Sequence, residues 1–202
     1  MTNNNTSATG GYVVPIVDPT LPVPLEDNAL DDFLQQMVSG VTGLPGTNVI
    51  PRWQPEPPSI LVGNWCAVGE VANDPDPYAY LLHQTTTAYP NGVDILMQWE
   101  NGIDCLCSFY GPLAGTNAKL FTNGVQEPQN REQLIINGYG LKNVTGPRIV
   151  PELVKMRWLR RVDVHFTLMR MVARYYPIEN IVSATATIET ESGLTEPVNV
   201  QE

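Results

Sequence analysis

The sequence predicts an α+β fold in which a few short helices pack on a mainly antiparallel, twisted sheet. Three observations support this prediction. Alternating apolar residues typical of strands recur from the middle of the chain onward, helical spacing is confined to short segments, and prolines break up the first quarter. The same patterns divide the chain into an extended N-terminal arm over residues 1–26, one domain over residues 27–191 and a flexible C-terminal tail over residues 192–202.

The composition disfavours export and tight binding to nucleic acid. With 21 acidic and 11 basic residues, the chain has a net charge of -10, which disfavours many phosphate contacts, although an acidic wall could let DNA pass without holding it. Cys66, Cys105 and Cys107 suggest no disulfide framework and indicate a reducing compartment. The sequence shows no signal-peptide pattern and no apolar stretch of roughly 18 residues, so we expect a soluble, unexported protein.

Residues 1–26 are rich in Asn, Thr, Gly and Pro and are interpreted as an extended arm. Prolines separate short apolar pieces that include Tyr12, Val14 and Ile16. Such apolar residues are unusual in a solvated tail, so the arm is expected to dock on a neighbouring subunit. A disordered terminus explains the same composition equally well.

The first helix is expected from about Asp27 to Val41. Its apolar residues follow helical spacing, acidic residues gather near its N-terminal end, and Gly43 with Pro45 ends the pattern. Residues 43–59 contain too many prolines for a helix or a central strand and are predicted to form an extended connection.

The clearest local pattern predicts a β-hairpin over residues 93–111. Apolar residues occupy alternate positions before and after Asn101-Gly102, a dipeptide typical of tight hairpin turns. A two-residue loop would place the two apolar sets on opposite faces, so a three-residue loop over residues 100–102 is predicted instead. The resulting register pairs Trp99 with Ile103 and Met97 with Cys105.

The remaining elements follow from the same rules. Strands are expected over residues 60–71, 78–87 and 140–144, and helices over residues 116–123 and from Pro128 to Gly138. A last pair of strands, residues 161–176 and 178–191, is predicted to join at Pro177. After Leu168 the apolar positions change face, which indicates a bulge, a bend or a change of partner surface.

Cys105 and Cys107 are the candidates for a metal or thiol site, with His165 or His83 to complete it. Their alternate positions on a strand point both sulfur atoms to one face, yet zinc sites usually have a second pair of ligands, which the sequence lacks. Free cysteines commonly pack as small buried hydrophobic residues, and this interpretation is favoured. No nucleophile with a base and no phosphate-binding loop is recognisable, so no catalytic residue, metal or cofactor is assigned.

A basic run stands out in this acidic chain and could meet an acidic surface of another subunit. A solvated face with local ion pairs is the equally open alternative. Aromatic residues often anchor interfaces, which makes Trp53 and Trp158 further candidates, although burial in the core is as well supported. The candidate subunit-interface residues are Tyr12, Val14, Ile16, Trp53, Lys155, Arg157, Arg160 and Arg161.

Five segments, taken together in this order and spacing, resemble the neck and tail terminator proteins of tailed bacteriophages. They are PRWQPEPP at 51–58, NWCAVG at 64–69, WENGIDCLCSFYG at 99–111, NREQLIINGYGL at 130–141 and LVKMRWLRRVDVHFTLMR at 153–170. The resemblance covers roughly residues 30–190 and leaves the N-terminal arm outside.

The resemblance implies a virion structural protein, made in the host bacterial cytoplasm, with no enzymatic activity, cofactor or membrane partner. Such proteins form a ring, commonly a hexamer, at the neck, where the ring ends the tail tube, joins it to the head-proximal connector and leaves a channel for DNA. The implied partners are further copies of the chain, the tail tube protein and head-completion or connector proteins; contact with the sheath protein is left open. DNA would pass without sequence-specific binding. A monomeric adaptor or chaperone of tail assembly is the alternative.

Overall fold

The computed structural model describes residues 13–16, 23–54, 63–85, 87, 89, 92–154, 156–178, 183–189 and 195–201. The chain divides into two compact units, and each is described by itself. The larger unit consists of residues 23–79 and 98–172, and the smaller unit of residues 1–22, 80–97 and 173–202. Two long strands contribute residues to both units.

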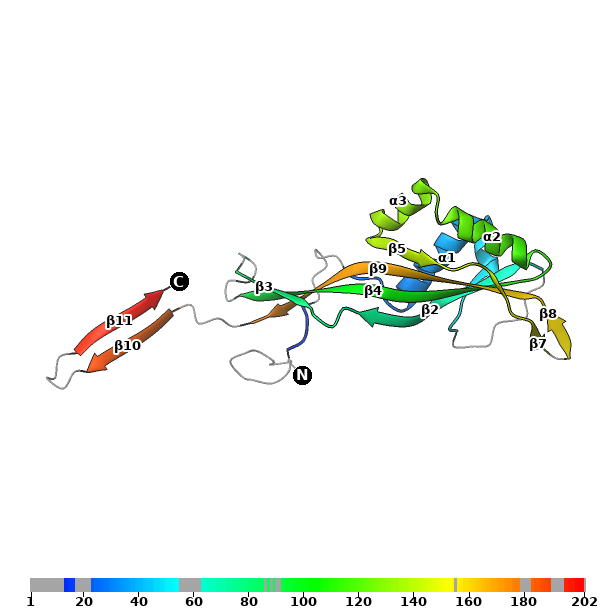
Figure 1. The fold of residues 1–202 in the computed structure, drawn as a ribbon. Helices are drawn as coiled ribbons and strands as arrows, with labels where there is room; N and C mark the ends of the chain where they lie inside the picture. The colour runs from blue at the N-terminus through cyan, green and yellow to red at the C-terminus, as the bar shows by residue number, and fades with distance from the viewer. Residues whose placement is uncertain are drawn as a thin grey trace. The chain divides into compact units, whose positions relative to one another are not determined.

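The described residues form three α-helices, a short 3-10 helix and eleven strands (Figure 1). The helices are α1 (Asn28–Thr42), α2 (Ala114–Gly124) and α3 (Pro128–Ile136), and the 3-10 helix is η1 (Gly46–Asn48). The strands are β1 (Val49–Pro51), β2 (Trp65–Pro75), β3 (Tyr80–Gln84), β4 (Val93–Tyr110), β5 (Tyr139–Val144), β6 (Arg148–Ile149), β7 (Glu152–Val154), β8 (Arg157–Leu159), β9 (Arg161–Pro177), β10 (Ser183–Glu189) and β11 (Thr195–Gln201).

The larger unit is built on a sheet with the strand order β1-β2-β4-β9-β5, in which β6 also pairs with β9. Strand β1 runs parallel to β2, whereas β2 is antiparallel to β4, and both β5 and β6 are antiparallel to β9. In the smaller unit, β3 is antiparallel to the first residues of β4. The predicted α+β class, a mainly antiparallel sheet with short helices, is confirmed.

Helix α1 begins and ends one residue later than predicted. Its apolar stripe, Leu30, Leu34 and Val38, is buried against the sheet and α2. The helix ends because Gly43 adopts a left-handed conformation (φ 74°) and donates its N–H to the carbonyl of Ser39 at 2.9 Å. The two later helices also form near their predicted positions.

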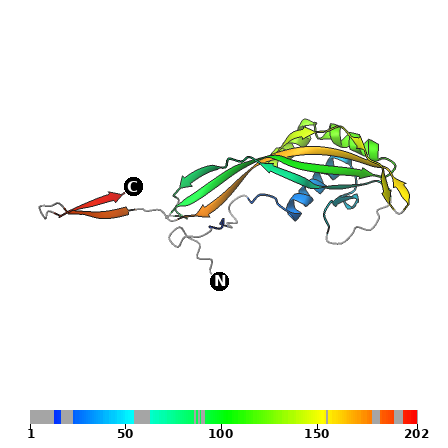
Figure 2. The ribbon, with the colours of Figure 1, turned by 60° about the horizontal axis from the view of Figure 1, so that its bottom comes forward.

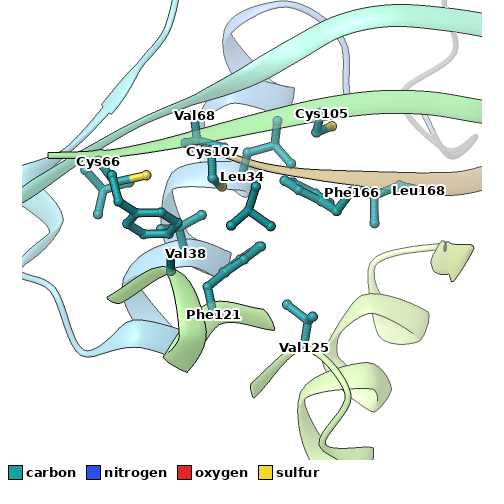
Figure 3. Close-up of a cluster of buried hydrophobic side chains, with 14 of the residues drawn as sticks. Leu34, Val38, Cys66, Val68, Cys105, Cys107, Phe121, Val125, Phe166 and Leu168 are labelled. Carbon is teal, nitrogen blue, oxygen red and sulfur yellow. The ribbon is translucent and has the colours of Figure 1, made fainter. Parts of the chain in front are cut away.

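The core of the larger unit lies between the helices and one face of the sheet (Figure 3). Phe121 of α2 packs against Phe109 of β4 and Phe166 of β9, with ring centroids 6.0 and 5.3 Å apart. Cys66 and Cys107 lie in the same core as free thiols with no exposed surface. This face therefore uses small thiols and large rings together to fill the space beneath the helices.

The hairpin predicted over residues 93–111 is wrong, because β4 runs without a turn through Asn101 and Gly102. Cys105 lies opposite Glu70 of β2, and Met97 lies opposite Tyr80 of β3, instead of facing each other. The chain reverses between Gln84 and Val93, which are paired partners at the end of the β3–β4 hairpin. The sequence has a second Asn-Gly there, and Gly92 has a positive φ of 112°.

A β-bulge explains why the apolar pattern around Asn101 was misleading. Gly102 pairs with Asp74, and Glu100 pairs with Pro75, so Asn101 is an extra residue in β4. An extra residue switches the faces of the strand, and the buried positions accordingly change from Glu100 before the bulge to Ile103 after it. The Asn101-Gly102 dipeptide therefore forms a bulge within a continuous strand, and the chain does not reverse there.

The predicted pairing of two strands around Pro177 is also wrong. Strand β10 pairs with β11 in a separate two-stranded sheet, and β11 occupies residues 195–201, where a flexible tail was expected. In β9 the buried face continues beyond Leu168 through Arg170 and Val172, while Met169 and Met171 are exposed. The apolar residues Met169 and Met171 therefore lie on the exposed face of β9, and the strand itself does not change the face that it buries.

Gly111, directly after β4, has a backbone conformation that only glycine adopts easily (φ 100°), and an added Cβ would lie 2.2 Å from the carbonyl oxygen of Gly63. We expect Gly111→Ala to lower the free energy of unfolding by about 2–4 kcal/mol, as measured by urea denaturation. Gly146→Ala is the control, because its Cβ meets no atom within 4 Å. Equal losses in both variants would contradict this account.

Candidate subunit interfaces

Trp53, a predicted interface residue, stands beside an acidic hollow at the start of α1. Its side chain is 78% exposed, so the alternative of burial in the core is wrong. The hollow has a volume of about 590 Å³, and its lining includes the carboxylates of Asp27, Asp31 and Glu70. We call these three residues with Trp53 the acidic hollow.

The carboxylates of the acidic hollow repel one another. Partial burial, together with the charges of Asp32 and Asp27, raises the pKa of Asp31. Burial is also the main reason that the pKa of Glu70 is raised, although the nearby Arg170 opposes this shift. A positive group placed in the hollow would relieve this unfavourable charge.

The β7–β8 hairpin carries an exposed apolar tip. Its two strands are antiparallel, with Leu153 opposite Trp158, and Met156 lies in the turn with a positive φ of 62°. Met156 is 89% exposed and Trp158 is 71% exposed, while Leu153 is also exposed. Large apolar side chains held in water at a hairpin tip are typical of a contact surface.

The base of this hairpin is fixed to the sheet by polar contacts. Glu152 accepts hydrogen bonds from the hydroxyl of Tyr110 at 3.0 Å and from Nη1 of Arg161 at 3.4 Å. Arg161 also binds both carboxylate oxygens of Asp163. Tyr110 stacks on Trp65 with a centroid separation of 3.9 Å, and burial raises its pKa to about 12. The tip is thus carried on an ordered base.

The predicted basic cluster divides into inward-facing and outward-facing members. Arg161 is half-buried and engaged by carboxylates of its own chain, whereas Arg160 is exposed. Lys155 and the side chain of Arg157 lie outside the described residues. The assignment of all four to a subunit interface stays a prediction.

The described part of the N-terminal arm lies beside the end of β9 within the smaller unit. The N–H of Ile16 donates to the carbonyl of Tyr175 at 2.6 Å, and Val14 is exposed. Tyr12 lies outside the described residues. One hydrogen bond ties the arm to its own chain here, and its predicted role in contacting a neighbour is untested.

A buried ion pair escaped the sequence-based prediction. Arg170 of β9 donates from Nε to Glu100 of β4 at 2.5 Å and from Nη1 to the hydroxyl of Tyr139 at 2.8 Å. Nη1 also donates to the carbonyl of Leu25, just before α1. Tyr139 stacks on Phe33 of α1 at 4.7 Å. One sequence feature could have indicated it: Arg170 occupies the next alternate position after Leu168, on a strand face whose other residues are apolar.

The alternative metal or thiol site does not assemble. Cys105 and Cys107 are fully buried, whereas His165 is exposed on β9 between the buried residues Val164 and Phe166. Within the described ranges, no group of three or more His, Cys, Asp or Glu side chains could hold a metal ion. The cysteines pack in the core, as the favoured interpretation predicted.

The buried thiols are expected to resist chemical modification in the folded protein. Burial raises the pKa of both Cys105 and Cys107, which keeps them in the unreactive protonated form. We expect a thiol-specific reagent at pH 8 to modify the native protein at least about tenfold more slowly than the urea-unfolded chain. Rapid labelling of either cysteine, located by peptide mass spectrometry, would contradict the buried placement.

Comparison with protein families identifies a relationship for most of the chain. A family model described as phage neck terminator protein matches residues 28–192, which extend from the start of α1 to beyond β10 and leave out β11. No curated protein shows significant similarity to the chain. In the part of the chain that the structure describes, no helix is long and apolar enough to cross a membrane.

Proposed function

The chain belongs to the phage neck terminator family, and on this premise we propose that it forms a closed ring at the neck of a tailed phage. In this role the ring ends the tail tube, joins it to the head-proximal connector and leaves a channel for DNA. The match over residues 28–192 carries the proposal, because it includes nearly all of the folded chain. The family is one of structural proteins, so shape and contacts perform this function without catalysis.

The distribution of surface features supports ring formation. Identical subunits joined head to tail need two different surfaces that fit each other. The larger unit offers an exposed apolar hairpin tip on β7–β8 and a separate acidic hollow beside α1. The partners proposed beyond the ring are the tail tube protein and the head-completion or connector proteins.

The charge of the chain supports passage of DNA without binding. A net charge of -10 gives each subunit a surplus of carboxylates over basic groups, and a channel wall with that surplus would repel phosphate. Tight DNA binding would require many contacts from Lys and Arg, of which the chain has 11 in total.

The decisive experiment combines light scattering with negative-stain electron microscopy, with and without purified tail tubes. We expect an open-centred ring with a mass of several times 22.3 kDa, or rings that appear on tube ends when tubes are added. Mass spectrometry of purified virions should find the protein in stoichiometric amount. A monomer that neither binds tube ends nor occurs in virions would contradict the proposal and favour an assembly chaperone.

The N-terminal arm provides a separate prediction. Deletion of residues 2–24 is expected to weaken ring assembly and to leave the larger unit folded, because among the described residues the core begins at Leu25. The deletion also keeps the Leu25 carbonyl that Arg170 binds. Assembly is measured by light scattering and folding by circular dichroism. Unchanged assembly of the truncated protein would show that the arm makes no useful contact between subunits.

A further inference from the structure

The β7–β8 hairpin carries an apolar tip that is exposed among the described residues. Its two strands form their own sheet, and within the described ranges they pair with no other strand. A two-stranded hairpin is marginally stable alone in water, and here the Tyr110–Glu152–Arg161 contacts hold its base. Met156 and Trp158 nevertheless remain exposed at the tip. The hairpin is therefore ordered at one end and available for contact at the other.

The basic residues of the chain are concentrated around this hairpin. Five of the 11 basic residues fall within residues 148–161, namely Arg148, Lys155, Arg157, Arg160 and Arg161. Glu152 is the only acidic residue in the same stretch, and it is already bound by Tyr110 and Arg161. The stretch thus combines positive charge with exposed apolar side chains.

The acidic hollow has the complementary character. It brings together Asp27, Asp31 and Glu70, and it places the exposed ring of Trp53 beside them. A partner suited to this surface carries cationic side chains next to a bulky apolar group. The β7–β8 hairpin has this combination, so charge complementarity selects a second copy of the chain.

We infer that the β7–β8 hairpin of one copy docks in the acidic hollow of the next, so that the positive charge of residues 148–161 lies near the carboxylates and the apolar tip lies against Trp53. This contact rests on the proposed ring and specifies how neighbouring subunits join. Burial, with a smaller contribution from neighbouring carboxylates, raises the pKa of Asp31 and Glu70 in the isolated chain, and incoming cations would stabilise their ionised forms.

The positions of the two surfaces require a head-to-tail contact. Glu70 of the hollow lies opposite Cys105, within β4, whereas the hairpin is bound to Tyr110 at the end of that strand. Figures 1 and 2 show the hairpin at this end of the sheet, away from the N-terminal end of α1. Two different surfaces on one subunit generate a heterologous interface. Repeated contacts of this kind close into a ring when the rotation between neighbouring subunits divides a full turn evenly.

Disulfide trapping tests the contact directly. When Trp53→Cys and Trp158→Cys variants are mixed and oxidised, we expect covalent dimers on a non-reducing gel, and a ladder of larger species when one chain carries both substitutions. The native cysteines are buried and contribute little background. Trp53→Cys mixed with Ile136→Cys, an exposed position at the end of α3, is the matched control and should give no comparable product.

Charge changes provide an independent test. Arg157→Glu or Glu70→Lys is expected to weaken self-association about tenfold or more, and the two together should recover most of this loss. Asp31→Asn with Glu70→Gln should also weaken association, yet raise the unfolding midpoint of the subunit, because repulsion within the hollow is removed. A misfolded variant could not show weaker association together with a higher unfolding midpoint.

The outcomes separate this contact from the proposed function. Rings that assemble normally with Arg157→Glu, or equal trapping in the Ile136→Cys control, would overturn the hairpin contact and leave the neck role intact. A chain that forms no rings, caps no tubes and gives no mixed disulfide would overturn both. Selective trapping with compensating charge reversal would establish the contact.

Discussion

Arg170→Met is expected to lower the free energy of unfolding by about 3–5 kcal/mol, since it leaves a buried carboxylate without its partner. The side chains of Arg170 and Glu100 are only 7% and 11% exposed, so water cannot replace the lost contact easily. The substitution also removes the donor to Tyr139 and to the carbonyl of Leu25. Urea denaturation at pH 7, monitored by tryptophan fluorescence, measures the loss.

Two further variants show whether charge burial causes this effect. Glu100→Gln combined with Arg170→Met should recover a large part of the lost stability, because no uncompensated charge then remains in this pair. Arg148→Met removes an exposed arginine and is expected to change stability by less than about 0.5 kcal/mol. If the double variant were no more stable than Arg170→Met, lost packing would be the better explanation.

Phe121→Ala is expected to cost about 3–5 kcal/mol, as is usual when a large buried ring is removed from a core. Phe121 has no exposed surface and contacts the rings of Phe109 and Phe166, so its removal leaves a cavity between α2 and the sheet. Leu120→Ala, at the neighbouring and half-exposed position of α2, is the control and should cost much less. Similar losses measured by urea denaturation would show that α2 does not cover the core as described.

Local patterns predicted the helices well because their signals are short-range. The first helix has an apolar stripe and a glycine that ends it, and both act within one or two turns. The strand around Asn101 was misjudged because the same dipeptide fits a tight turn and a bulge. Only the pairing of Asp74 with Gly102 and of Pro75 with Glu100, from a distant strand, decides between them.

The candidate interfaces show the same limit. Trp53 was selected for its residue type, but its exposure and its position beside three carboxylates depend on the packing of β1, β2 and α1. The exposed tip at Met156 and Trp158 likewise depends on two short strands pairing only with each other. Arg170 and Glu100 lie 70 residues apart, and no sequence pattern links them.

The bond from Arg170 to the carbonyl of Leu25 also has a mechanical consequence. Leu25 lies just before the first turn of α1, and a helix end unravels readily without such a bond. A pull on this segment is shared with Arg170 of β9 and, through Glu100, with β4. Tension from the N-terminal side is therefore spread over two long strands of the sheet before the helix begins to unwind.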